Sequence, residues 1–396
     1  MHRNNKIKVA ILAISSVIMA STTTSAILAD ISAHYKGISE SVIQMVLTLP
    51  ALVGMFFAIT SGPISEKMAK KTIVLIGLFC GLVGGALAFT LGETSIYILL
   101  LSSILIGINQ GINSTMSMAL IADYFTGEES SSLMGLQSAF VNGGGMVIIF
   151  TSGLLAGIHW RYSYLVYLVL LLIIAIVIRN LPNDPPIQAT SSSTSTPVEK
   201  GKLNSTVYFT CTLLFFFAFF MFVFQANVSM LIVGNGLGDA TSSGLANSLL
   251  SGAGAVTGFA YGRIKRALKN NLIPVAVLSA GIGMLLVYSI GTLSSVFIGA
   301  IMIGFALSSL MPTFMFINAE AVTPAMSATA IALTNGASNI GMFISPLFIN
   351  PLMNTIGKVN IEGKFLFSAI GLFALSIIAL AGRKKFQVKP RGGDTV

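Results

Sequence analysis

The residue types that enzymes use for chemistry are scarce in this sequence and are not grouped. The chain has three histidines and two cysteines. Both cysteines, Cys80 and Cys211, lie inside long apolar runs, where a reduced structural role is usual. The stretches GINQGIN and NGGGM lack the Lys-Ser/Thr that follows a phosphate-binding loop. We therefore expect no catalytic residue, no metal, no cofactor and no enzymatic activity.

Charge is concentrated in one short stretch, GPISEKMAKK, residues 62–71, between two apolar runs. Acidic and basic residues make up only 9% of the chain, and 54% of residues are hydrophobic. An average soluble protein has about 25% charged residues. Because so few charges cannot cover a soluble surface, we predict an all-α integral membrane protein.

Twelve apolar runs are long enough to cross the hydrocarbon core, which takes roughly 20 helical residues. They are residues 7–29, 40–62, 72–91, 95–118, 132–157, 162–179, 205–233, 241–262, 272–291, 294–317, 325–350 and 363–382. The first run could instead be a cleaved signal sequence. We favour its retention, because it approaches full spanning length and leaves an even number of spans.

The basic residues set the orientation of these spans. With the N-terminus inside, all of the 22 lysines and arginines fall on the cytoplasmic side except four. The four are Lys36, Arg161, Lys358 and Lys364. Cytoplasmic loops are typically rich in these residues, so we predict that both termini are cytoplasmic. Topology and contact with anionic lipid then explain the net charge of +9, and no nucleic acid partner is expected.

A polar, low-complexity stretch at residues 180–204 divides the spans into six and six. The predicted organisation is a six-helix bundle at 1–179, a cytoplasmic linker at 180–204, a six-helix bundle at 205–382 and a basic cytoplasmic tail at 383–396. A shift of 197 residues aligns Asp123 with Glu320 and Asn142 with Asn339. This repeat favours two pseudo-symmetric halves.

The stretch at 62–71 resembles the signature of the major facilitator superfamily, Gly-x-Leu-x-Asp-Arg-x-Gly-Arg-Arg/Lys, which occupies the same loop. The matching positions are Gly62, Ile64, Glu66, Lys67, Lys70 and Lys71. Ala69 stands where the family usually has glycine. Residues 262–271, GRIKRALKNN, are similar to a degenerate second copy. The resemblance implies the major facilitator fold and a transporter that alternates access around a midplane site.

In that family the loop acts as a latch that holds the cytoplasmic side closed, joined by an acidic position that Asp123 matches. The predicted latch therefore comprises Gly62, Glu66, Lys67, Lys70, Lys71 and Asp123. Gly62 would let a helix end tightly, and Glu66 could pair with a base or a helix N-terminus. The competing interpretation is that the lysines only set the topology.

No acidic residue lies near the middle of a predicted span. Proton antiport needs a group whose pKa changes between access states, commonly an ionisable side chain inside the bilayer. Gly107 also stands where many proton-coupled exporters of the family carry an arginine. We expect transport to depend only weakly on the proton gradient. The nearest candidates for a titrating site are Asp30, His34 and Glu40 at the predicted outer face. The competing and favoured interpretation is that they belong to an ordinary solvated loop.

Neutral polar and aromatic residues are the candidates for a substrate site. Asn109 and Asn113 share one face of the fourth span, and the opposite face, with Gly107 and Gly111, suits close packing. The predicted substrate-binding residues are Asn109, Asn113, Asn142, Phe217, Phe220, Phe224, Gln225, Asn335 and Asn339. Asparagines that only bridge helices are the competing interpretation. The series Gly77, Gly81, Gly85 and Gly254, Gly258, Gly262 also indicate helix packing.

We predict a monomeric secondary transporter of a bacterial cell membrane, whose partners are a small organic substrate and the lipid bilayer. Export of a mainly apolar compound is favoured, because ADYFTGEESSSLMG and HWRYSYLVY resemble bacterial multidrug-type members of the family. Uptake or facilitated diffusion of a neutral polar metabolite is the alternative, favoured by the asparagines and Gln225.

Overall fold

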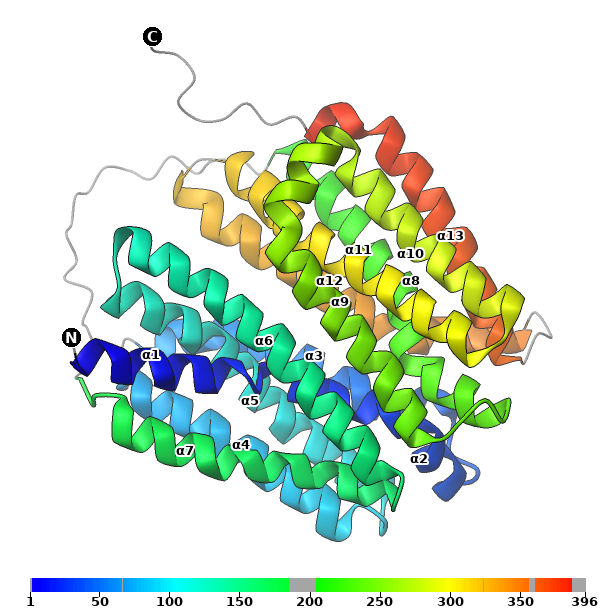
Figure 1. The fold of residues 1–396 in the computed structure, drawn as a ribbon, viewed down its shortest axis with the longest axis horizontal. Helices are drawn as coiled ribbons and strands as arrows, with labels where there is room; N and C mark the ends of the chain where they lie inside the picture. Colours follow the sequence, from blue (N-terminus) through cyan, green and yellow to red (C-terminus); the bar gives the residue numbers. More distant parts are fainter. Residues whose placement is uncertain (1, 66, 185–203, 323, 356–359, 387–396) are drawn as a thin grey trace. The chain divides into compact units, whose positions relative to one another are not determined.

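The computed structural model describes residues 2–65, 67–184, 204–322, 324–355 and 360–386 (Figure 1). These residues form α-helices and short 3₁₀-helices, and no strand occurs among them. Ten helical segments of the described chain are long and apolar enough to cross a membrane. In that number α9, η3 and α10 count as one segment, and α12 is not included.

The helices of the first predicted half are α1 (His2–Ser15), η1 (Ile18–Ala26), α2 (Leu28–His34), α3 (Glu40–Ser65), α4 (Lys70–Leu91), α5 (Ile96–Tyr124), α6 (Gly127–Ala156), η2 (Trp160–Leu168) and α7 (Val169–Asn180). Those of the second are α8 (Ser205–Gly234), α9 (Ala240–Leu268), η3 (Lys269–Asn271), α10 (Leu272–Ile290), α11 (Leu293–Glu320), α12 (Pro324–Thr355), α13 (Ile361–Ala381) and η4 (Arg383–Phe386). Every predicted span overlaps one or more of these helices, so the all-α prediction is confirmed.

The first predicted span is not one continuous α-helix. It is divided into α1, the 3₁₀-helix η1 and the short α2. In η1 the hydroxyls of Thr22, Thr23 and Ser25 donate to carbonyls three residues earlier, at 2.7, 2.8 and 2.6 Å. Hydroxyl side chains that bond nearby carbonyls compete with regular α-helical geometry, and a 3₁₀-helix uses the same three-residue spacing. The sixth span likewise begins with a 3₁₀-helix, η2.

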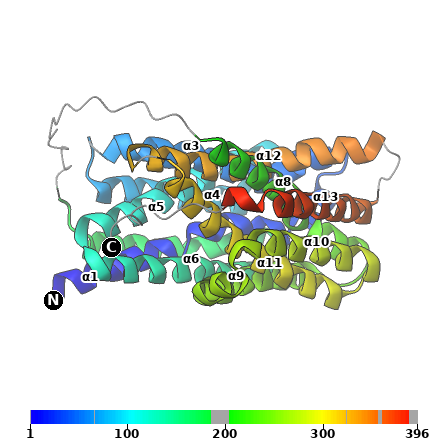
Figure 2. The ribbon, with the colours of Figure 1, turned by 90° about the horizontal axis from the view of Figure 1, so that it is seen from above.

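The chain forms two compact units, which are described separately. The first comprises residues 1–190 and 225–255, and the second comprises residues 191–224 and 256–396. In the first unit α3 and α4 both pack against α5 (Figure 1). In the second unit α10 contacts both α11 and α13 (Figure 2). Most of the predicted linker at 180–204 lies outside the described residues, and the predicted division there stays a prediction.

Small residues let α3 and α5 approach closely. A Cβ atom added to Gly111 would come within 2.2 Å of the Gly54 carbonyl oxygen, and one added to Gly107 within 2.8 Å of the Pro50 carbonyl oxygen. The hydroxyl of Ser103 donates to the carbonyl of Val46 at 2.8 Å. The packing role predicted for this face of α5 is therefore confirmed.

The two glycine series differ in their surroundings. Added Cβ atoms at Gly77, Gly81 and Gly85 would come within 2.8, 2.8 and 2.4 Å of Asn113, Asn109 and Tyr167. At Gly258 and Gly262 an added Cβ atom meets no described atom within 4 Å. The packing prediction is right for the first series and wrong for these two glycines, because spacing shows only that close approach is possible.

Candidate functional site

The basic loop after α3 ties three helices of the first unit together. Lys70, the first residue of α4, forms an ion pair with Asp123 near the end of α5. The two side chains are 22% and 23% exposed. The ammonium group of Lys71 donates to the carbonyl oxygen of Ile178 on α7 at 2.8 Å. Two predicted latch lysines are therefore engaged with neighbouring helices, although their role in transport stays a prediction.

The other predicted latch residues, Gly62, Glu66 and Lys67, are not shown to contact a neighbouring helix. Gly62 is inside α3, which continues to Ser65, so the prediction that the helix ends at Gly62 is wrong. The hydroxyl of Ser65 donates to the Gly62 carbonyl at 2.6 Å. Lys67 follows in a turn and makes no ion pair within the described part of the chain. Glu66 lies outside the described residues.

The fourth-span amides are buried between α4 and α5. Asn113 Nδ2 donates to Asn109 Oδ1 at 2.8 Å, and the two residues are 0% and 2% exposed. They lie against Gly77 and Gly81 of α4. Such an arrangement is typical of asparagines that bridge packed helices, so the structure places these two residues in packing rather than on an exposed surface.

Two of the three residues on the predicted aromatic face of α8 are buried, and Phe220 keeps part of its surface exposed. Phe217 and Phe224 are 1% and 0% exposed, and the Phe224 ring stands edge-on to Phe365 of α13, with ring centroids 6.3 Å apart. The Phe220 ring occupies the space beside Gly371, where an added Cβ atom would come within 2.4 Å of it. These contacts belong to the core of the second unit.

Four polar residues of the predicted substrate set keep part of their surface exposed. They are Asn142 on α6, Gln225 on α8, and Asn335 and Asn339 on α12. Asn142 Nδ2 donates to the Ser138 carbonyl at 3.0 Å. The side chains of Asn335 and Asn339 make no hydrogen bond to any described residue. These amides therefore retain donors and acceptors that a ligand could use.

A seam between α8 or α9 and the first predicted half was missed by the sequence analysis. We define this seam as the contacts that residues 225–255 make with residues 1–190; both segments belong to the first compact unit. Gln44 Nε2 donates to Asn227 Oδ1 at 3.0 Å and to the Ala226 carbonyl at 3.2 Å. The hydroxyl of Ser229 donates to the Ala26 carbonyl at 2.8 Å. Neutral hydrogen bonds thus join α8 to η1 and α3.

The α9 side of the seam uses small residues. A Cβ atom added to Gly153 of α6 would lie 2.8 Å from the Cα atom of Gly244. The hydroxyl of Thr241 donates to the Gly153 carbonyl at 3.2 Å, and that of Ser248 to the Met146 carbonyl at 3.3 Å. The run ATSSGLANSLLSGAG at the start of α9 was the available signal, since small residues mark close helix contacts.

The three outer residues predicted as a titrating cluster have separate partners. His34 Nε2 bonds to the Glu93 carbonyl oxygen at 3.0 Å, and Glu40 Oε1 accepts from Gln44 at 3.1 Å. Asp30 lies near a different acid, Asp239. Burial raises the pKa of the Asp30 carboxyl, the charge of Asp239 raises it further, and His159 opposes both.

Asp239 shows the opposite behaviour at the start of α9. Its Oδ1 atom accepts from the backbone N–H of Ser242 at 3.0 Å. This bond is the main reason that the pKa of Asp239 lies below its ordinary value. Glu93 forms a further outer contact, with Arg161 Nη1 at 3.0 Å and His159 Nε2 at 3.3 Å. Among the described residues, no group of three histidines, cysteines or acids is placed to hold a metal ion.

Comparison with known proteins identifies the type of fold. The family model described as Major Facilitator Superfamily matches residues 9–346. The structure is similar to a POT family transporter crystallised with a thioalcohol-conjugated peptide, with a TM-score of 0.77, 12% identity and 96% coverage of each chain. A POT family transporter in complex with 5-aminolevulinic acid gives a TM-score of 0.77 at 11% identity, again covering 96% of each chain. A peptide transporter POT in complex with sulfate gives 0.74 at 13% identity, covering 96% of this chain and 95% of the other.

Proposed function

Because the chain belongs to the major facilitator superfamily, and so is a membrane transporter and not an enzyme, we propose that it carries a small, neutral, hydrogen-bonding solute by alternating access. The observation that carries this proposal is the contrast among the candidate residues. Asn142, Asn335 and Asn339 are partly exposed, whereas Phe217 and Phe224 are fully packed.

The neutral character of the proposed solute rests on the composition of α12, the helix that carries Asn335 and Asn339. Over Pro324–Thr355, α12 contains no acidic or basic residue. Its two asparagines offer both donors and acceptors, and a site built from such groups discriminates against molecules that leave them unpaired. A charged substrate would require a compensating charge, because an unpaired ion in a membrane-embedded site is costly. The lack of acidic and basic residues along α12 therefore favours an uncharged polar solute.

The seam supports the alternating-access part of the proposal. The hydrogen bonds described across it join neutral groups, such as Ser229 to the Ala26 carbonyl and Gln44 to Asn227, and Gly153 closely approaches Gly244. Each such bond contributes only about 1 kcal/mol net. A solute with a few kcal/mol of differential affinity can therefore shift the seam between made and broken states.

Export of a mainly apolar compound was favoured by a resemblance in the segments ADYFTGEESSSLMG and HWRYSYLVY. Phe217 and Phe224, the aromatic residues that could have received such a compound, are buried in the second unit. The transport direction remains the sequence-based expectation, and apolar substrates serve as one outcome of the following test. The dependence on the proton gradient is also still expected to be weak.

Flux measurements in proteoliposomes test the proposal. The panel contains neutral polar solutes and lipophilic dyes, each assayed with and without a pH gradient. We expect saturable flux of a neutral polar solute that changes little when the gradient is collapsed. Flux of lipophilic dyes alone would contradict the proposed substrate class.

A seam that can be locked provides the mechanistic control. A Cβ atom added to Gly157 lies 2.7 Å from Oγ1 of Thr241, so the two positions are close enough to test an engineered disulfide between the variants Gly157→Cys and Thr241→Cys. With Cys80 and Cys211 replaced by alanine, oxidation should stop flux and reduction should restore it. Each single variant should be insensitive to oxidation. Undiminished flux through the oxidised double variant would contradict alternating access through this seam.

A further inference from the structure

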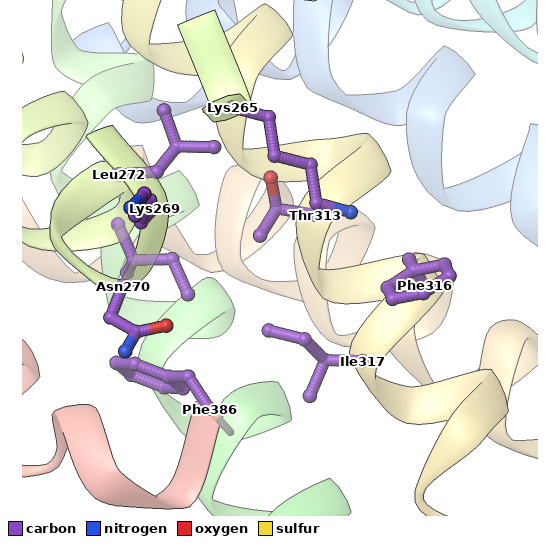
Figure 3. A pocket seen from close by; sticks show the side chains of 9 residues that line it. Lys265, Lys269, Asn270, Leu272, Thr313, Phe316, Ile317 and Phe386 are labelled. Carbon is purple, nitrogen blue, oxygen red and sulfur yellow. The ribbon is translucent and has the colours of Figure 1, made fainter. Parts of the chain in front are cut away.

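A cavity of about 170 Å³ lies within the second unit, where the end of α9, η3, the start of α10, the last turns of α11 and η4 meet (Figure 3). By the same measure a single water needs roughly 10–15 Å³, so the cavity holds a group of several atoms. By the predicted topology it lies at the cytoplasmic end of the spans, at the level of the lipid head groups. None of the residues predicted for substrate binding lines it.

Two lysines give the cavity a positive wall. Lys265 and Lys269 both line it, and neither has a carboxylate within 4.0 Å among the described residues. Glu320, at the end of α11, makes no ion pair with either of them. In the first half Asp123 neutralises Lys70, and no described acid does the same here. Two unpaired cations that share a cavity attract an anion.

The other walls hold the lysines and leave polar atoms available. Lys265 Nζ stands 3.9 Å from the centroid of the Phe316 ring, and Figure 3 shows its side chain running toward Thr313 and Phe316. A cation held against an aromatic face in this way is positioned without losing its charge. On the other side of the cavity lie Asn270 and Phe386. The Asn270 amide makes no hydrogen bond to any described residue.

The backbone at the cavity is strained at one of these lysines. Lys269 has a φ of +46°, the only positive φ of a non-glycine residue in the described chain. Glycine or asparagine adopts this conformation more readily. The backbone conformation therefore does not explain a lysine at position 269. A role for the positive charge of Lys269 does explain it.

We propose that this cavity binds the phosphate group of an anionic phospholipid from the cytoplasmic leaflet. Basic pockets between membrane helices on the cytoplasmic side recognise such head groups. The phosphate would accept from Lys265, Lys269 and the Asn270 amide. Phe316 is 51% exposed, so its free face provides an apolar surface next to the charged wall for the start of an acyl chain. A free phosphate ion carries the same kind of charge as the lipid head group, but it has no acyl chain that could contact Phe316.

Titration of the purified full-length protein in detergent tests the proposal. The probes are phosphatidylglycerol, phosphatidylcholine and inorganic phosphate, with binding followed by native mass spectrometry. We expect phosphatidylglycerol to bind in preference to phosphatidylcholine, and millimolar inorganic phosphate not to displace it. In the double variant Lys265→Gln, Lys269→Gln the affinity for phosphatidylglycerol should fall by about tenfold or more.

The matched control, Arg263→Gln with Arg266→Gln, removes two charges of α9 that do not line the cavity. It should leave the affinity within about twofold, because exposed charges are screened by salt. Equal weakening in both double variants would overturn the proposal, because the attraction would then be diffuse. Inorganic phosphate that competes as well as the lipid would overturn the lipid assignment. The single variant Lys269→Asn suits the left-handed backbone, so it should lose lipid affinity at an unchanged melting temperature. Unaltered affinity in this variant would also overturn the proposal.

Discussion

The basic loops of the two halves differ in what their lysines contact. In the first half, Lys70 is paired with Asp123 and Lys71 donates to a backbone carbonyl of α7. In the second half, Lys265 and Lys269 line a cavity and have no ion pair among the described residues. Two similar basic stretches can therefore differ in use, one with its charges paired inside the protein and the other with its charges available to a ligand.

The glycines show the same difference. Gly77 and Gly81 of α4 receive the side chains of α5, whereas Gly258 and Gly262 of α9 meet no described neighbour within 4 Å. The glycine spacing is identical in the two halves. Only the facing helix decides whether a glycine is a packing position or an exposed one.

The largest expected effect separates these glycines. In the variant Gly81→Leu the new side chain collides with Asn109, whose atoms lie 2.8 to 3.0 Å from an added Cβ atom. Overpacking a helix contact costs roughly 1–3 kcal/mol or more, so we expect a large loss of folded protein in size-exclusion chromatography. Gly258→Leu, the matched control, should elute like the wild type. Equal losses in the two variants would remove the distinction between the series.

A second prediction separates buried from exposed amides. Asn113→Leu leaves the Oδ1 atom of Asn109 without its donor, and a buried polar atom without a partner costs about 1–3 kcal/mol. The melting temperature should fall while KM for the transported solute stays unchanged. In Asn339→Leu we expect the reverse, a raised KM at unchanged stability. A changed KM in Asn113→Leu alone would instead assign substrate binding to the buried pair.

The paired loop should matter more for transport than its counterpart. Asp123→Asn removes the partner of Lys70, and a partly exposed ion pair contributes roughly 1 kcal/mol. If the pair stabilises one access state, the transport rate should fall about fivefold. The control is Glu320→Gln, at the position that aligns with Asp123, because Glu320 has no ion pair among the described residues. Wild-type transport rates in both variants would contradict the latch and would support the interpretation that the lysines only set the topology.

The smallest effect concerns pH and the two acids near the seam. Asp30 has a raised pKa, so its contribution to folding is present below its unfolded pKa and is lost as pH rises through the folded pKa. Asp239 has a lowered pKa, so its contribution is present above its unfolded pKa and is lost as pH falls through the folded pKa. At pH 7, Asp30→Asn should raise the melting temperature slightly and Asp239→Asn should lower it.

Acidification provides the control for this pair. Both differences from the wild type should shrink as pH falls, that of Asp30→Asn first, because its folded pKa is the higher one. Differences of the same sign in the two variants would show that their environments are alike.

Sequence patterns were sufficient for the spans because helices in a bilayer must be long and apolar. The small face of α5 was also predictable, because glycines repeated on one face of a membrane helix allow a neighbouring helix to approach closely. The partners of the amides were not predictable. Asn109 and Asn142 look equivalent in sequence, and only the glycines of α4 decide that Asn109 is covered.

The seam and the cavity depend on contacts between residues that are far apart in the chain. Gln44 and Asn227 are separated by 183 residues, and no local pattern links them. The cavity requires Phe386, which follows the last span, beside the end of α9. By contrast, the hydroxyl-rich run STTTS in η1 was a readable local signal for the break in the first span.

The two 3₁₀-helices of the first unit share a length of nine residues and are joined by the bond from Tyr167 Oη to the Ala20 carbonyl at 2.8 Å. Nine residues extend about 18 Å as a 3₁₀-helix and about 13.5 Å as an α-helix. Rewinding either segment would thus shorten it by about 4.5 Å and rotate its end by roughly half a turn. Because η1 leads into α2, a change between 3₁₀ and α geometry in η1 would shift and rotate α2 and its Asp30 relative to α1.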